Sequence, residues 1–309
     1  MKRKLFQVVF ILTLCLASLS ACGKKSEEPA KSEEPSSAVA AEEKKEEQKA
    51  PVQEPEAAQE PAAKEPETEN SSEGFENSGE SVRFNYVSYH DAMTADDGFE
   101  ALGYFENMPE FDIAGNPEAT KTINDFFALM TKGQHEDFES LAAEALADYN
   151  DFGNEIEDYP EGYMENSCEI VRSDDNVISV IQTYTVFYPG SDHPSYDSTC
   201  YSFRTKTGEV LVNDEIFNDP QAVNEMLKAR IEYEASEGEY KDVLYPEYRE
   251  LIENIFSDNN WFFDAEGITL IVNPSEFAPY EAGRLSFAVS YDDLAGNLKD
   301  DYILPGSTK

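Results

Sequence analysis

Three histidines limit the chemistry that this chain can perform. They are His90, His135 and His193, and no two of them have the spacing that places a pair of zinc ligands on one face of a helix. His193 stands close to Ser195 and Asp197, the residue types of a hydrolytic triad, but neighbours in one loop rarely meet in triad geometry. We therefore expect no bound metal, no cofactor and no catalytic activity.

Acidic segments are the next candidates for chemistry. Thr94–Gly98 faintly resembles the Thr-Phe-Asp-Asp-Gly motif of polysaccharide deacetylases, but the zinc histidines that accompany that motif are missing. Asp174-Asp175-Asn176 and Asn213-Asp214 offer oxygen ligands without the spacing of a calcium-binding loop. We interpret all three segments as turn or cap residues.

The cysteines divide into two pairs with different fates. Cys15 and Cys22 lie in an N-terminal segment that is described below, so Cys168 and Cys200 are the only thiols of the folded part. In an oxidising exterior an isolated pair indicates a disulfide. A metal site with two cysteines is the alternative, but neither cysteine has a second Cys or His nearby at ligand spacing. We expect the Cys168–Cys200 disulfide.

The first 22 residues have the pattern of a lipoprotein signal peptide. Three basic residues come first, an apolar run follows, and the segment closes as Leu19-Ser20-Ala21-Cys22. The thiol at the cleavage point is the group that bacterial lipoprotein processing acylates. A short transmembrane anchor is the alternative, although the apolar run is shorter than the ~20 residues that span a bilayer. We expect a lipid on Cys22 and a location at the cell membrane, on its extracytoplasmic face.

Composition separates a tether from a folded region. Residues 23–80 repeat Glu, Pro, Ala, Lys and Ser with one aromatic residue, so we expect a disordered tether that spans roughly 40 Å. Residues 81–309 contain 47 Asp and Glu against 13 Lys and Arg, a net charge of −34. This charge excludes nucleic acid as a partner and favours a cationic one, or simply solubility.

Hydrophobic periodicity predicts an α+β fold with largely antiparallel sheets. Strands are expected near the beginning of the folded region, and Asn116-Pro117 predicts a helix start, with a second helix from about Glu136 to Tyr149. Alternating strands follow up to about residue 212, then a helix from Asp219-Pro220, another over 246–256, and three strands between 261 and 290. We place domains at 81–215 and 216–309.

Two groups of segments resemble a known family. The stretch from Trp261 to Ile268, with Asn273–Gly283 after it, looks like the C-terminal domain of the lysozyme-sensing anti-sigma factor of sigma-V, and segments between 176 and 217 resemble the domain before it. The resemblance implies a lysozyme-binding ectodomain, a type of domain that is also found before polysaccharide deacetylase domains. The relatives carry a cytoplasmic segment and a transmembrane helix, whereas a lipid is expected here, so control of a sigma factor is not implied.

Aromatic residues in these segments are the candidates for ligand contact. Proline and glycine surround them, which predicts a rigid loop, and loops on a scaffold often carry binding function. Core packing is the alternative reading for each of them. The candidates are Trp261, Phe263, Phe277, Tyr280 and His193.

The expected function is therefore a non-catalytic binding module held at the membrane by its lipid. A cationic protein such as lysozyme is the first expected partner. A module that binds peptidoglycan or another wall glycan through exposed aromatics is the alternative, and an envelope enzyme or hydrolase accessory is a third.

Overall fold

Six strands form the first sheet. The computed structural model describes residues 76–77 and 81–304, so the predicted signal with Cys22 and most of the predicted tether lie outside the described residues. The strands follow chain order across the sheet: β1 (Glu76–Asn77), β2 (Val82–Thr94), β3 (Glu100–Ile113), β4 (Gly162–Ser173), β5 (Val177–Phe187) and β6 (Ser195–Arg204). All neighbours are antiparallel except β3 and β4, which are parallel. No described helix has the length and apolar character needed to cross a membrane.

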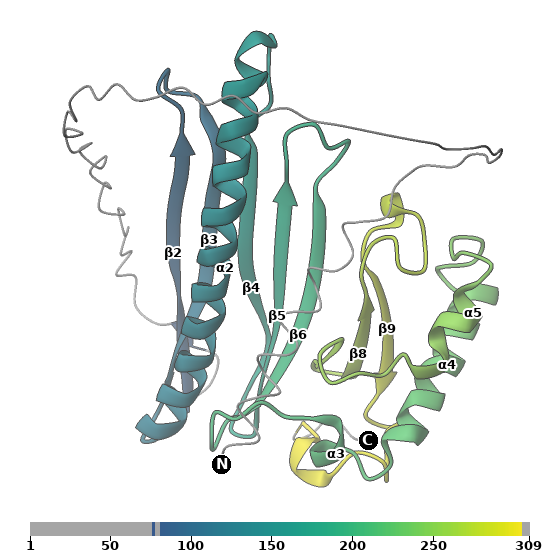
Figure 1. Cartoon of the computed structure of the whole chain (residues 1–309). Coiled ribbons are helices and arrows are strands. Elements are labelled where there is room, and N and C mark those ends of the chain that lie inside the picture. The colour runs from purple at the N-terminus through teal and green to yellow at the C-terminus, as the bar shows by residue number, and fades with distance from the viewer. Residues whose placement is uncertain (1–75, 78–80, 305–309) are drawn as a thin grey trace, which may run out of the picture. The chain divides into compact units, whose positions relative to one another are not determined.

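A single helix, α2 (Pro117–Asp151), connects the two parallel strands and lies along one face of the sheet (Figure 1). The side chain of Asn116 accepts a hydrogen bond from the backbone N–H of Ala119, so the predicted helix start is confirmed. The prediction of two helices is wrong, because α2 continues through Gly133 without a break. Buried side chains along the whole length of α2 pack both halves of the helix against the sheet. The free energy of this packing outweighs the loss of helix stability that one glycine causes. A short 3-10 turn, η2 (Gly153–Glu155), follows.

Three antiparallel strands form the second sheet, in the order β7-β8-β9. They are β7 (Trp261–Phe263), β8 (Gly267–Val272) and β9 (Leu285–Ser290). Helix α4 (Pro220–Ser236) packs on this sheet, and its predicted start is confirmed by the side chain of Asp219, which accepts from Ala222 N. The shorter elements are α3 (Asn213–Ile216), α5 (Tyr248–Leu251), η3 (Ile252–Asn254), η4 (Tyr280–Ala282) and η5 (Asp300–Tyr302).

These two sheets confirm the α+β fold class. The helix predicted over 246–256 reduces to α5 and η3, and the strand predicted at 210–212 reduces to one bridge between Val210 and Phe203. The predicted domain boundary at 215/216 falls within α3, and the division into two domains stays a prediction.

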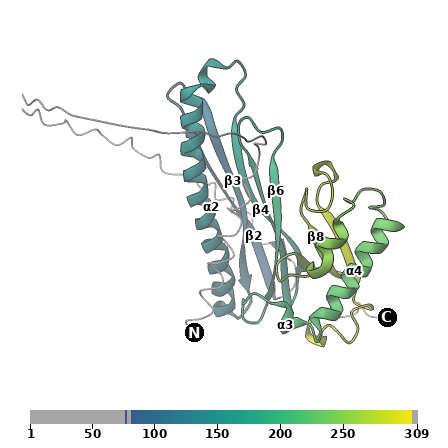
Figure 2. The ribbon, with the colours of Figure 1, turned by 45° about the vertical axis from the view of Figure 1, so that its right-hand side comes forward.

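The two faces of the first sheet have different neighbours. Side chains alternate between faces along a strand, and Tyr104 of β3 stacks on Phe138 of α2, which defines the helix face. On the opposite face, Ile181 and Cys200 pack with Ile271 of the second sheet. Figure 2 shows α2 and the second sheet on opposite sides of the first sheet, with the second sheet beside one end of the long strands. The other end of this opposite face, near Phe105, is called the open face below.

Cys168 and Cys200 are free thiols, so the predicted disulfide is wrong. Cys168 is paired with Gln182 on β5 and Cys200 with Ile181, which are successive residues whose side chains point to opposite faces. The cysteines also lie two strands apart, roughly 10 Å, whereas bridged Cβ atoms lie about 3.8 Å apart. The sheet itself therefore keeps the two sulfur atoms from meeting.

The outer edge of β6 is occupied by loops from the second half of the chain. The amide of Asn273 accepts from Ser198 N at 2.7 Å and donates to Ser198 O at 3.2 Å. Further along, Cys200 N donates to Asn259 O and Leu211 N donates to Ser202 O. These groups face away from β5, so each would otherwise have been open for another strand to pair with.

Candidate functional site

One row of side chains crosses the open face of the first sheet. The strand register aligns His90 with Phe105, Phe105 with Glu165, Glu165 with Thr185, and Thr185 with Tyr196. Directly paired residues point to the same face, and Phe105 points away from α2 because Tyr104 points toward it. Five strands thus present one continuous row of side chains on the face opposite to α2.

Aromatic rings dominate this row and the row next to it. Phe105 is 45% exposed, although large apolar side chains are usually buried. The ring of His90 stacks on it, with 4.6 Å between the ring centroids. In the neighbouring row, the ring centroids of Tyr163 and Phe187 lie 5.7 Å apart, and both side chains are half-buried. The open face therefore offers flat apolar surface between small polar side chains.

A loop of the second half of the chain extends the row beyond β6. His193 and Tyr280 stack with 3.7 Å between ring centroids, and the Tyr280 hydroxyl donates to Pro194 O at 2.6 Å. Tyr196, the last residue of the row, meets the Tyr280 ring edge-on at 6.2 Å. Two of the five predicted ligand candidates, His193 and Tyr280, thus lie together at the surface and adjoin the open face.

The other three candidates are core residues. Trp261 is 2% exposed, Phe263 is not exposed at all, and Phe277 is 3% exposed. Trp261 and Phe263 belong to β7 rather than to a loop, and the Trp261 indole donates to Asn213 Oδ1 at 2.9 Å. The expectation that these three rings meet a ligand is corrected, because their dense spacing comes from the core of the second sheet.

Electrostatics around the open face are one-sided. The sequence has no lysine or arginine over 84–120, 133–171 or 173–203, which include the strand segments of the open face and the loops that join them. Beside the His193 loop, desolvation by surrounding protein raises the pKa of Asp197, and it raises the pKa of Glu276, whose neighbour Asp197 adds to the effect. The strand segments of the open face thus carry negative charge without lysine or arginine, whereas Arg284, which donates to Ser198 Oγ at 3.0 Å, is a cation beside the His193 loop.

The acidic motifs have structural partners. Tyr149 donates to Asp97 Oδ2 at 2.6 Å, and this bond holds the pKa of the Asp97 carboxyl below its ordinary value. Nδ1 of His193 lies 2.9 Å from Pro194 O, and within residues 81–304 no hydrogen bond joins His193, Ser195 and Asp197. In the described part of the chain, no group of three or more His, Cys, Asp or Glu side chains could hold a metal ion.

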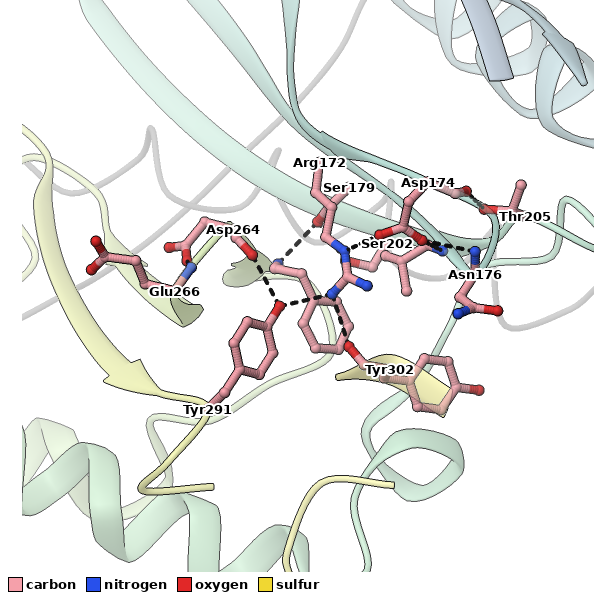
Figure 3. Close-up of polar contacts among 12 residues, drawn as sticks. Arg172, Asp174, Asn176, Ser179, Ser202, Thr205, Asp264, Glu266, Tyr291 and Tyr302 are labelled. Carbon is pink, nitrogen blue, oxygen red and sulfur yellow. Dashed lines mark hydrogen bonds and ion pairs between the residues drawn. The ribbon is translucent and has the colours of Figure 1, made fainter. Parts of the chain in front are cut away.

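The densest polar cluster lies where the two sheets meet (Figure 3). Arg172 of β4 donates from Nε to Asp174 Oδ2 at 2.6 Å and from Nη1 to the Tyr291 hydroxyl and to Tyr302 O, both at 2.8 Å. Its guanidinium lies over the Phe263 ring, 5.2 Å from the centroid. The Arg172 cluster ties β4 to β7 and to the C-terminal segment, so we interpret it as a structural joint.

Two aspartates beside this joint close hairpins in the same way. Asp174 Oδ1 accepts from the backbone N–H groups of Asn176 and Val177, and Asp264 Oδ1 accepts from those of Glu266 and Gly267. Such turns are the usual use of an Asp side chain between strands. The prediction that Asp174 is a turn residue is thus confirmed, and the Asp264–Gly267 part of the family-like segment is a turn of the same kind.

Sequence reasoning missed His90, Phe105, Tyr163 and Phe187 as surface residues. The signal that could have found them is alternation: Phe105 sits between Tyr104 and Glu106, which are buried, and is therefore on the other face. Using this signal requires the strand order, because only the register brings residues from five strands into one row.

Part of the chain is similar to a protein family of unknown function. Residues 214–292 match the family model "Protein of unknown function (DUF3298)". A crystal structure of a DUF3298 family member from Bacteroides fragilis NCTC 9343 is similar, with 15% identity, a TM-score of 0.55, and coverage of 73% of this chain and 96% of that chain. A DUF3298 family protein from Pseudomonas aeruginosa PAO1 has 12% identity, a TM-score of 0.45, and coverage of 71% and 94%.

At these identities the first of these structures supports the fold alone. Among the curated proteins, none matches this sequence. The likeness to the sigma-V anti-sigma ectodomain stays a resemblance. Over residues 214–292, which are less than half of its length, the chain is similar to the DUF3298 family.

Proposed function

We propose that the described region is a non-catalytic binding module that docks a cationic protein on the open face and on the adjoining stack of His193 and Tyr280. The observation that carries the proposal is the combination, on the open face, of exposed aromatic rings and strand segments without lysine or arginine. Aromatic residues supply the buried anchors of protein interfaces. Charge complementarity steers the encounter and selects the partner.

Lysozyme is the cationic partner that we propose first, because the family resemblance in the Trp261–Gly283 segment implies it. A lipid on Cys22 would hold the module on the extracytoplasmic face of the membrane, where such a partner arrives. The net charge of −34 in residues 81–309 supports long-range attraction to a basic enzyme. The attraction weakens when salt shortens the screening length.

Calorimetric titration of the whole chain with lysozyme tests this proposal. Phe105→Ser should weaken binding by about tenfold or more if Phe105 is an interface anchor. Leu129→Ser is the matched control, because Leu129 is 60% exposed on α2, which covers the opposite face. Equal affinities of the two variants would reject the open face as the interface, and no binding at any salt concentration would reject lysozyme as the partner.

A charge reversal separates a specific interface from general attraction. Glu165→Lys places a cation in the centre of the row, whereas Glu139→Lys makes the same change of net charge on α2. We expect the first variant to bind much more weakly than the second. Equal losses would mean that the partner senses only the overall charge.

A wall-glycan module is the second candidate function. The specific observation in its favour is the accessible aromatic surface of Phe105 and of the His193–Tyr280 stack, since flat rings can stack on sugar rings. Peptidoglycan pull-down by the whole chain at low and high salt distinguishes the two candidates. Retention that survives high salt and is lost in Phe105→Ser would favour the glycan, because stacking is screened far less than charge attraction.

A further inference from the structure

The contact between α2 and the first sheet is interrupted by a layer of polar side chains. One apolar cluster beneath the helix contains Met108, Met130 and Cys168, and a second contains Phe138 and Met164. Between them lie the polar layer residues Glu106, Gln134, His135, Asn166 and Gln182. Buried polar groups cost free energy unless they are hydrogen-bonded, so such a layer requires partners for each of its atoms.

The sheet contributes three deeply buried members of the layer. Asn166 is 0% exposed, Gln182 is 5% exposed and Glu106 is 8% exposed. Gln182 Nε2 donates to Asn166 Oδ1 at 2.7 Å, and the hydroxyl of Tyr104 donates to Glu106 Oε2 at 2.7 Å. These two bonds leave the Nδ2 of Asn166 without a partner at hydrogen-bond geometry. Burial and Glu106 raise the pKa of Tyr104, and Asn166 opposes this rise, so the Tyr104 hydroxyl also lies near the Asn166 side chain.

Helix α2 contributes the other two members. Gln134 stands four residues after Met130 and four before Phe138, a position in the helix stripe that faces the sheet. His135 stacks on Tyr89 with 4.6 Å between centroids, and its Nε2 lies 3.8 Å from Glu106 Oε2, beyond hydrogen-bond distance. Gln134 Oε1 and His135 Nε2 are both buried without a partner.

Unpaired atoms thus concentrate in one place. Among the described residues, the structure has four buried side-chain nitrogen or oxygen atoms without a hydrogen-bond partner, and three of them belong to the polar layer: Gln134 Oε1, His135 Nε2 and Asn166 Nδ2. Gln134 Oε1 can only accept a hydrogen bond and Asn166 Nδ2 can only donate one. A molecule that satisfies both must therefore be a donor and an acceptor at once.

We propose that the polar layer is a built site for ordered water, in which at least one molecule accepts from Asn166 Nδ2 and donates to Gln134 Oε1. Water fits because it both donates and accepts, and because the atoms to be satisfied are enclosed between two apolar clusters, where a larger ligand would have to displace packed side chains. Buried waters typically make about three hydrogen bonds to such groups. The Tyr104 hydroxyl, the Glu106 carboxylate and the imidazole of His135 are further polar groups of the layer to which such a water could bond.

With this site occupied, the middle of α2 would contact the first sheet through water, and the turns on either side of the middle would contact the sheet through apolar side chains. The water would join residues of α2 to β4, and so fix which turn of the helix lies over which row of the sheet. A dry core with the same polar residues would leave opposite hydrogen-bonding groups unpaired in one enclosure, which native proteins rarely tolerate.

A crystal structure of the protein at a resolution that shows ordered water is the direct test. We expect a water within hydrogen-bond distance of both Asn166 Nδ2 and Gln134 Oε1. An empty layer, or a direct hydrogen bond between these two side chains, would overturn the proposal.

Thermal unfolding of Gln134→Met gives an independent test, because the direction of the change in Tm distinguishes a hydrated polar layer from a dry one. Methionine preserves the length of the side chain and removes the acceptor. If water occupies the site, the variant loses a hydrogen bond and the unfolding equilibrium constant rises by about tenfold, with a lower Tm. If the acceptor is dry and unsatisfied, its removal relieves a penalty, and a Tm that is unchanged or higher would contradict the proposal. Gln221→Met, on the exposed surface of α4, is the matched control and should leave the Tm unchanged.

Discussion

Replacement of Arg172 by methionine should destabilise the protein strongly. Arg172 is 6% exposed and joins the two sheets through Asp174, the Tyr291 hydroxyl and the backbone of Tyr302. Removing one partner of a buried ion pair costs about 3–5 kcal/mol, because the other charge stays buried without compensation. Asp174 keeps hydrogen bonds from two backbone N–H groups, and its side chain is 23% exposed. We therefore expect the lower end of that range, about 3 kcal/mol.

Urea unfolding followed by tryptophan fluorescence measures this loss. Trp261 is the only tryptophan of the chain, is 2% exposed, and lies in β7, next to the joint that the substitution breaks. The midpoint should fall while the slope stays constant, as expected for a change of stability alone. Lys121→Met is the control, because the Lys121 and Asp125 side chains of its ion pair are 73% and 64% exposed and such pairs contribute little. A loss no larger than that of the control would refute the interpretation of Arg172 as the joint between the sheets.

Three further predictions follow from the same geometry. Tyr149→Phe should raise the pKa of Asp97 toward its ordinary value, because the Tyr149 hydroxyl favours the ionised carboxyl. The hydrogen bond stabilises the fold above pH ~4, and this stability is lost as the pH falls through the lowered pKa of the folded state. An NMR titration in which the Asp97 pKa does not change would contradict the prediction. Cys168 and Cys200 should resist alkylation in the folded protein, because burial raises the pKa of both thiols, that of Cys200 to about 12. Both thiols should react once the protein is unfolded, without added reductant. Mass spectrometry that finds the two cysteine peptides linked would restore the disulfide. Gly267→Ala should destabilise by more than about 2 kcal/mol, because its Cβ would lie 2.0 Å from Val289 O, and an unchanged denaturation midpoint would show that β8 and β9 can separate at no cost.

Much of the fold was accessible from local signals. Asn116 and Asp219 cap helices where the sequence predicts it, and the strands of the second sheet follow the alternation of Ile268, Leu270 and Val272. The parallel pairing of β3 with β4 was not accessible in this way, because a helical crossover decides it rather than any residue of the two strands.

The candidate site was harder to predict for a related reason. Aromatic density near Trp261 indicated a binding loop, yet the rings fill the core of the second sheet, since sequence spacing does not tell which face of a short strand is covered. The disulfide prediction failed likewise, because it depends on the facing of side chains two strands apart. His193 and Tyr280 were found from sequence, but their stacking needed the fold to bring together loops separated by more than eighty residues.

The loops along the outer edge of β6 have a consequence for crowding. Asn273 and Asn259 already occupy backbone groups of Ser198 and Cys200 that another polypeptide would need for strand addition. Edge-to-edge strand pairing between neighbouring molecules is a common route to aggregation. Copies of the protein crowded on a surface cannot pair in this way along the outer edge of β6. Any partner that reaches this side of the molecule must be recognised through side chains.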